Sequence, residues 1–272
     1  MFRSKELYDE IESVVDKSKK KLTKGKYAVA IIDGSNFKTF TKYMKRPFDI
    51  IFRNAMERTM LSICSRVNGC IIGFTQSDNI CVIFRETAKG FFMDGEVFNL
   101  TSFFASHASM FFNQYFEEEY YKVRESDDKN YNLVERDFNV YREKMWTAYF
   151  HVNIVQFNKK DLNKVLIYNQ KLAYRNSTNL VAQTYFTDEQ LKGKSGYEQK
   201  EMLKKRGIDY NRYPRRYRMG CMCIKTKLWI EEENVYSRPK WRFVETVNFE
   251  KEPEYIIQLI DDLKENEEEE DA

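Results

Sequence analysis

The sequence has few of the residues that zinc sites and disulfide frameworks require. Its 272 residues include five cysteines, none of them in a CxxC pair, and only two histidines, His107 and His151. Most of the cysteines stand inside apolar runs. We therefore expect neither a zinc site nor a disulfide framework, and we expect a reducing location, the cytoplasm.

Long apolar runs are also missing. No run approaches the roughly 20 residues that a bilayer-spanning helix needs. The first residues, Met1-Phe2-Arg3-Ser4-Lys5-Glu6, lack the apolar centre of a signal peptide. These absences predict a cytoplasmic protein without a membrane partner.

A large net charge is absent as well, since 45 basic residues face 42 acidic ones. The charges are unevenly distributed, however. Residues 261–272 contain eight acidic side chains and one lysine, whereas residues 200–218 contain eight basic and two acidic ones. A basic body behind an acidic tail suits a polyanionic partner. The alternative is a solvated tail and an ordinary helix surface.

The apolar patterns follow the order strand, helix, strand, strand, helix, strand. Strands are expected at 27–32, 70–74, 80–84 and 148–157, and helices at 48–67 and 98–116. This β-α-β-β-α-β order is that of the ferredoxin-like palm domain, so the predicted fold class is α+β. We also expect a helix at 4–22 and a polar excursion at 117–143. In the second half we expect helices at 160–184 and 196–206, strands at 217–230 and 241–247, and a last helix from 253, all packed on the palm.

Two aspartates stand at the ends of these apolar runs. Asp33 follows the first strand, and Asp78 lies in the turn of the expected hairpin. If the strands pair, both carboxylates meet at one sheet edge, where palm polymerases hold two Mg²⁺ ions. Gly34 would let the backbone present a carbonyl there. The alternative is that both segments are ordinary turns, since Asp, Ser, Asn and Gly favour turns.

Several short motifs occur in a fixed order along the chain, and together they resemble the tRNA-His guanylyltransferase superfamily. These are palm-fold enzymes that add nucleotides in the 3′-to-5′ direction. The motifs are Ile31-Ile32-Asp33-Gly34-Ser35-Asn36-Phe37 with Arg46-Pro47, Ile72 to Asn79, Tyr168-Asn169-Gln170 with Arg175 to Asn179, Leu191 to Ser195 with Glu201-Met202-Leu203, and Gly207 to Asn211 with Pro214 and Tyr217 to Gly220.

The resemblance implies a Mg²⁺-dependent nucleotidyltransferase that adds nucleotides to the 5′ end of tRNA or a tRNA-like RNA, in tRNA-His guanylylation or 5′-end repair. GTP and ATP would be substrates, and a homo-tetramer is the expected assembly. Asp33, Gly34 and Asp78 would hold two Mg²⁺ ions, with Asp33 and Asp78 catalytic. The nucleotide-binding residues would be Asp33, Gly34, Ser35, Asn36, Phe37, Lys38, Ser77 and Asp78.

For the RNA we select polar residues that can contact phosphates. They are Arg175, Asn176, Lys192, Lys194, Ser195, Asn211, Arg215 and Arg216. Tyrosines alternate with arginines from Tyr210 to Tyr217, a pattern able to stack bases or simply a turn with a basic edge. The expected division is an N-terminal helix at 1–25, a palm catalytic domain at 26–157, a tRNA-facing region at 158–252, and a C-terminal helix with an acidic tail at 253–272.

The sequence departs from the family pattern near the aspartates. Asn79 replaces an acidic residue, Ser35 an arginine, Lys38 a histidine and Ser102 a lysine, while His151 stands in place of an acidic residue and has no assigned role. Two rival functions stay open. A nucleotide cyclase would use the same two aspartates without RNA, and a catalytically weakened RNA-binding protein would explain the departures.

Overall fold

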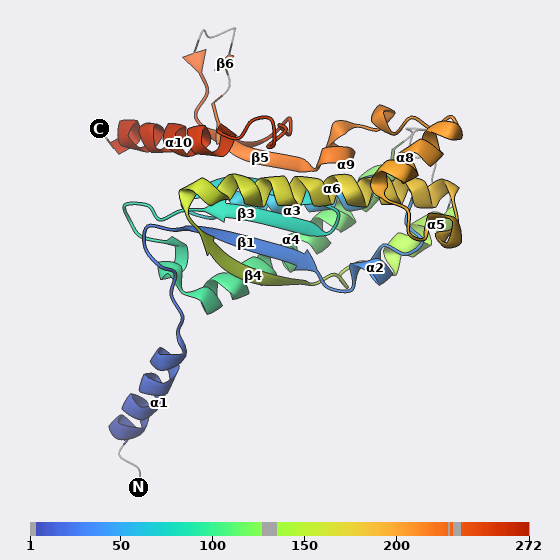
Figure 1. Cartoon of the computed structure of the whole chain (residues 1–272). Helices are drawn as coiled ribbons and strands as arrows, with labels where there is room; N and C mark the ends of the chain where they lie inside the picture. The colour runs from blue at the N-terminus through green and yellow to red at the C-terminus, as the bar shows by residue number, and fades with distance from the viewer. Residues whose placement is uncertain (1–3, 127–134, 228, 231–234, 272) are drawn as a thin grey trace.

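A computed structural model of the chain describes residues 4–126, 135–227, 229–230 and 235–271 (Figure 1). Its centre is a sheet of six strands in the order β4-β1-β3-β2-β5-β8. Every neighbouring pair in this sheet is antiparallel. The strands are β1 Tyr27–Gly34, β2 Cys70–Gln76, β3 Asn79–Phe84, β4 Phe150–Phe157, β5 Cys221–Thr226 and β8 Lys240–Val244.

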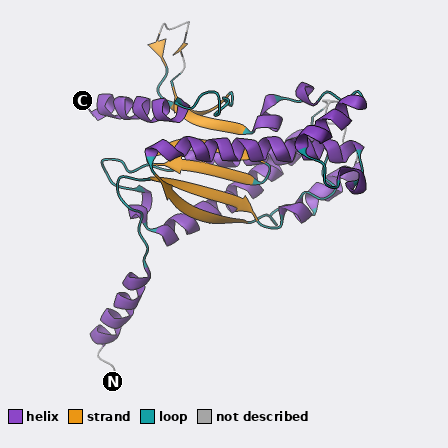
Figure 2. Ribbon diagram, viewed as in Figure 1, coloured by secondary structure: helices purple, strands orange, loops and turns teal. Residues whose placement is uncertain are grey.

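Helices cover both faces of the sheet and extend beyond its ends (Figure 2). The shorter elements include a separate two-stranded hairpin and three 3₁₀ turns. The helices are α1 Ser4–Ser18, α2 Phe37–Phe40, α3 Ile50–Cys64, α4 Val97–Arg124, α5 Glu135–Arg142, α6 Leu162–Tyr185, α7 Asp188–Leu191, α8 Gly196–Lys205, α9 Arg215–Met219 and α10 Tyr255–Asp271, and the short elements are η1 Phe92–Gly95, η2 Lys159–Asp161, η3 Tyr210–Arg212, β6 Trp229–Ile230 and β7 Val235–Tyr236.

The predicted α+β class and the β-α-β-β-α-β order are confirmed, because β1, α3, β2, β3, α4 and β4 follow one another along the chain. Apart from Asp33 and Asn79 at their ends, β1 and β3 consist of mainly buried residues without charge, as expected for central strands between two helical layers. Beyond the expected palm, β5 pairs with β2 and β8 with β5. The second half of the chain therefore adds two strands to the sheet, which extends beyond the domain boundary expected at residue 157.

Two hydrophobic cores lie on opposite faces of the sheet. One contains residues of α3 and α4 together with β1 residues such as Ala30 and Ile32. The other contains residues of α6 and α10 together with the alternate β1 residues, such as Val29. A smaller core under α6 and α8 contains Val181 and Leu203. In the described part of the chain, no helix combines the length and the apolar character that crossing a membrane would require.

Several boundaries differ from the sequence expectation, and three of the differences change the reading of a segment. The stretch expected as an excursion is helical on both sides of residues 127–134, which lie outside the described part. α4 continues to Arg124, because Glu119 is buried and accepts hydrogen bonds from Arg58 and Asn54 at 3.0 and 2.7 Å. The strand expected from Tyr217 begins only at Cys221, after α9, and the helix expected at 4–22 ends at Ser18.

Gly73 lies in the middle of β2, at a position that has no room for a side chain. A methyl group there would lie 2.5 Å from the Cys64 Sγ and 2.9 Å from the Cys223 Sγ. Both thiols belong to the fully buried core between β2, α3 and β5. The close approach of these elements therefore requires glycine at this position.

We predict that Gly73→Ala lowers the free energy of unfolding by about 1–3 kcal/mol, because the added methyl overpacks the core. Urea denaturation followed by circular dichroism measures this. Gly196→Ala is the matched control, since a methyl at this α8 position meets nothing within 4 Å. Equal midpoints for the two variants would contradict the packing at Gly73.

Candidate active site

The ends of three adjacent strands bring the predicted site residues together. In the sheet register Asp33 lies opposite Asn79 of β3 on one side and His151 of β4 on the other. The Gly34 amide donates to the Asp78 carbonyl oxygen at 3.1 Å, which joins the end of β1 to the hairpin turn. The structure thus places Asp33 and Asp78 at one sheet edge, and their roles as ligands stay a prediction.

Two side chains hold the carboxylate of Asp33. Asn79 Nδ2 donates to Asp33 Oδ1 at 2.6 Å, and His151 Nε2 lies 3.4 Å from Asp33 Oδ2. The other ring nitrogen of His151 lies 3.0 Å from Ser35 Oγ. His151, which had no role in the sequence analysis, therefore links Asp33 to the loop that follows β1.

The environment of Asp78 disfavours its charged form. Burial is the main reason that its pKa is raised, and the nearby negative charge of Asp33 acts in the same direction. The Ser77 hydroxyl and the His151 ring oppose this shift without cancelling it. A cation would relieve the electrostatic repulsion between two adjacent, half-buried carboxylates, and carboxylate oxygens are hard ligands that suit Mg²⁺.

The ligand set for such a cation is small. Among the described residues, no group of three or more histidine, cysteine, aspartate or glutamate side chains is placed to hold a metal. Asp33 and Asp78 would therefore need a backbone carbonyl and oxygens of the substrate to complete the coordination. The donor chemistry fits Mg²⁺, which normally keeps several waters or phosphate oxygens.

Among the predicted nucleotide-binding residues of the loop after Asp33, Phe37 can act only through its backbone. Phe37 is 2 % exposed and packs against Phe40 and Phe150, so its side chain anchors the loop and cannot contact a ligand. A methyl group on Gly34 would lie 2.3 Å from the Phe37 ring, which requires glycine there. The exposed Lys38 and the backbone of the loop remain accessible.

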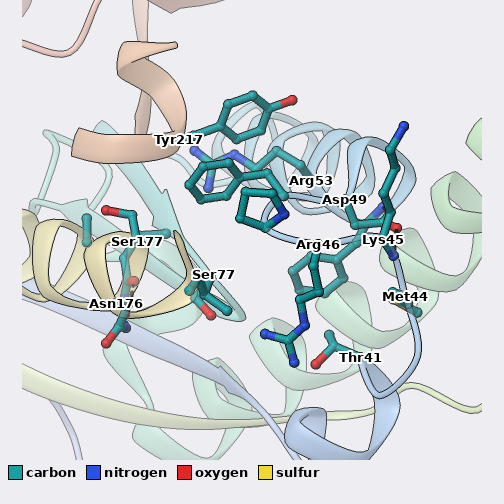
Figure 3. A pocket seen from close by; sticks show the side chains of 16 residues that line it. Thr41, Met44, Lys45, Arg46, Asp49, Arg53, Ser77, Asn176, Ser177 and Tyr217 are labelled. Atoms are coloured by element: carbon teal, nitrogen blue, oxygen red, sulfur yellow. Dashed lines mark hydrogen bonds between the residues drawn. The ribbon is translucent and has the colours of Figure 1, made fainter. Parts of the chain in front are cut away.

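An open pocket adjoins the hairpin turn at Ser77 (Figure 3). One wall is aromatic, because Phe48 and Tyr217 stack with ring centroids 4.8 Å apart. Asn176 of α6 lies beside Ser77, and the exposed Arg46 extends toward Thr41 at the opposite side. The pocket is therefore apolar inside with polar groups at its rim.

Sequence reasoning missed most of this pocket. It used Arg46-Pro47 only as part of a motif and assigned no role to Thr41, Lys45 or Phe48. A local signal was present, since two basic residues and an aromatic residue stand just before Asp49, which caps the N-terminus of α3 by accepting from the Phe52 amide at 2.8 Å.

The predicted RNA residues fall into three groups. Arg175 is exposed on α6, and Asn176 Nδ2 donates to Gln76 Oε1 at 3.1 Å, which joins α6 to the end of β2. Lys192, Lys194 and Ser195 lie at α8, where Ser195 is the N-cap and Lys194 pairs with Glu198 at 3.3 Å. In the third group, Asn211 accepts from Arg218, and the exposed Arg215 lies 3.3 Å from Glu245.

Arg216 forms an ion pair within the protein, although its side chain is 39 % exposed. Its Nη1 lies 3.1 Å from Oε2 of Glu57, whose side chain is 6 % exposed, and Arg53 Nε lies 2.6 Å from the other oxygen. A buried carboxylate needs such partners, since an unpaired charge in the interior is costly. Arg216 therefore attaches α9 to α3, and its contact with RNA stays a prediction.

Comparisons with known proteins give consistent results. The family model described as tRNAHis guanylyltransferase (Thg1) matches residues 8–158. A protein of Acanthamoeba polyphaga mimivirus named "Uncharacterized protein R259" is 26% identical over 185 residues, covering 61% of this chain and 58% of that protein. The match thus spans less than two thirds of the viral protein.

Solved structures share the fold. A bacterial tRNAHis guanylyltransferase (Thg1)-like protein in complex with ATP has a TM-score of 0.76 at 22% identity and covers 93% of this chain and 99% of its own. The complex with GTP gives 0.72 at 21% identity, with coverage of 94% and 99%. The tRNA(His) guanylyltransferase of Saccharomyces cerevisiae has a TM-score of 0.58 at 19% identity, and the match covers 76% of this chain and 90% of that one.

We predict that Asn79→Asp raises Mg²⁺ affinity by about tenfold, because a third carboxylate would act on the cation at short range. Isothermal titration of the protein with MgCl₂ measures this. Asn79→Ala separates the lost hydrogen bond to Asp33 from the added charge. Unchanged affinity in the Asp variant would show that position 79 does not sense the cation.

Asp49 gives a pH prediction. Burial raises its pKa, although it accepts bonds from the Phe52 amide and the Tyr141 hydroxyl. The folded state therefore binds the proton more tightly, and this group's contribution to stability falls as the pH rises from about 4 through its raised pKa. Asp49→Asn should become progressively more stable relative to the parent over this range. Urea unfolding between pH 4 and 8 would reveal a pH-independent difference if this assignment is wrong.

Proposed function

Because the chain belongs to the tRNAHis guanylyltransferase (Thg1) family, we propose that it is a nucleotidyltransferase that adds GTP-derived or other nucleotides to the 5′ end of a tRNA or tRNA-like RNA. Family membership makes it an enzyme of the transferase class. The RNA, the nucleotide and the metal are the proposed part, as are a homo-oligomeric state and a cytoplasmic location.

One observation carries the proposal: Asp33 and Asp78 converge at one end of the central strands β1 and β3, and Ser77, which directly precedes Asp78, lines the pocket. A nucleotide bound there would have its phosphates near the carboxylates and its base in the pocket. Pockets with apolar walls and a few polar groups at the rim are typical of such ligands.

Asp33 and Asp78, with the Gly34 carbonyl, are the groups that would hold Mg²⁺. When bound, Mg²⁺ supplies charge neutralisation to the phosphates during phosphoryl transfer. The hydrogen bond from Asn79 and the contact with His151 keep the Asp33 carboxylate in one orientation. This preorganisation limits the rearrangement that ligand binding requires.

The remaining groups would orient the nucleotide. Phe48 and Tyr217 offer aromatic faces on which a base can stack. Lys38, in the loop after Asp33, and Arg46, which lines the pocket, are exposed cations, and both suit phosphate oxygens. For the RNA, the exposed Arg175 directly precedes Asn176, whose amide donates to Gln76 at the end of β2.

The proposed reaction has two steps. A 5′-phosphate oxygen of the RNA attacks the α-phosphate of ATP and releases pyrophosphate, which activates the RNA end. The 3′-hydroxyl of the incoming GTP then attacks the activated 5′ phosphate and releases AMP. Both steps need two phosphate-bearing groups held in line at the aspartates.

A catalytically weakened RNA-binding protein is the second candidate. The observation in its favour is the 2.6 Å hydrogen bond from Asn79 to Asp33, which engages an oxygen that a cation would use. Metal-dependent turnover separates the two candidates, because only the enzyme needs the carboxylates to be free for a cation.

We predict that Asp33→Ala and Asp78→Ala each reduce nucleotide incorporation by at least about a hundredfold, since each removes a carboxylate ligand of the Mg²⁺ ions that would neutralise the reacting phosphates. The assay combines radiolabelled GTP, ATP, Mg²⁺ and 5′-truncated tRNA. Asp9→Ala, at an exposed position of α1, is the control, and circular dichroism checks the fold. Near-normal turnover of either variant would contradict the site. Labelled product without RNA would instead indicate a cyclase.

A further inference from the structure

A lysine of α8 lies between two aromatic rings. The Lys200 Nζ is 3.4 Å from the ring centroid of Tyr174 on α6 and 4.6 Å from that of Tyr210 in η3. The guanidinium carbon of Arg218 lies 5.8 Å from the same Tyr210 ring. The elements α8 and α9 thus place two cations around the ring of Tyr210, and α6 adds the ring of Tyr174.

These two cations lack a neutralising carboxylate. Within the described residues, neither Lys200 nor Arg218 forms an ion pair, and Arg218 donates instead to the Tyr213 carbonyl and to Asn211 Oδ1 at 2.8 and 3.4 Å. Burial and the charge of Arg218 lower the pKa of Lys200. The positive potential here is therefore unbalanced, and an anion would relieve the repulsion.

The cluster is held rigidly before any ligand binds. Tyr210 is 4 % exposed, its hydroxyl lies 2.6 Å from Ser177 Oγ, and Ser177 also donates to the Arg218 carbonyl at 3.2 Å. The contacts with the rings restrict the Lys200 side chain. A cation fixed in this way loses less side-chain entropy on binding than a free surface lysine.

The position relates the cluster to the candidate active site. Tyr174 directly precedes Arg175, and Asn176 is bonded to Gln76 beside the hairpin turn. Tyr174 of the cluster is 41 % exposed. Tyr197, one turn before Lys200 on α8, is 75 % exposed, so the cluster is accessible from solvent. A polyanion that enters the site past Arg175 would continue across α6 to Lys200.

We propose that Lys200 and Arg218 form a second anion site that binds a phosphate group of the RNA backbone, away from the phosphates at Asp33 and Asp78. The choice of RNA rests on the proposed function. Neither residue belongs to the predicted RNA set, and Tyr210, which the sequence suggested as a stacking residue for bases, serves here as a buried platform for the lysine.

The test is RNA binding without turnover. Fluorescence anisotropy of 3′-labelled tRNA is measured over a series of KCl concentrations. Lys200→Gln should weaken binding about three- to tenfold and reduce the slope of log affinity against log salt by about one, as expected for one lost phosphate contact. Lys200→Arg should retain most of the affinity, and GTP affinity measured without RNA should stay within about twofold.

The matched control is Lys204→Gln, which removes one charge from an exposed position on the same helix. An identical salt slope for both Gln variants overturns the proposal, as does an equal loss of GTP affinity, which would assign the anion to a nucleotide triphosphate. Absence of RNA binding by the parent protein at every salt concentration also refutes it. A lack of nucleotide incorporation with an altered slope would leave this site standing while the proposed function fails.

Discussion

The antiparallel pairing of β1 with β3 is the constraint on which the rest of the site depends. It sets Asp33 opposite Asn79, and the bond from the Gly34 amide to the Asp78 carbonyl then fixes the hairpin turn beside the strand end. A shift of one residue would turn the Asp33 side chain to the opposite face of the sheet. The buried apolar residues of both strands oppose that shift, because it would also move each of them to the opposite face of the sheet, where it would lose its packing partners.

The pocket depends on a second, long-range constraint. Glu57 is buried between Arg53 and Arg216, and this arrangement attaches α9 to α3. Since α9 also carries Tyr217, the same ion pairs hold its ring against Phe48 at the pocket wall. Arg53 itself lines the pocket, and Arg216 donates to the Tyr217 hydroxyl at 3.2 Å, so the charge network forms part of the wall that it supports.

The site differs in charge from one built of carboxylates alone. An amide and an imidazole, Asn79 and His151, contact the two oxygens of Asp33, so its orientation is fixed by donors. Fewer negative charges lower the attraction for a cation, while an orientated ligand lowers the cost of ordering it. On the other side of α6, Lys200 and Arg218 supply unneutralised positive charge. A polyanionic substrate would therefore be attracted more by the protein's cations than by a metal-rich centre.

The sequence alone determined the elements and the two aspartates. Local patterns sufficed, because β-branched runs predict strands and Asp33 and Asp78 stand directly at the ends of such runs. Only the tertiary structure decided the partners. Arg216 binds Glu57, 159 residues away, and Lys200 lies against rings from two other segments. No local pattern encodes these contacts, since whether a basic residue is buried in an ion pair or exposed to a ligand depends on which distant surfaces the fold brings to it.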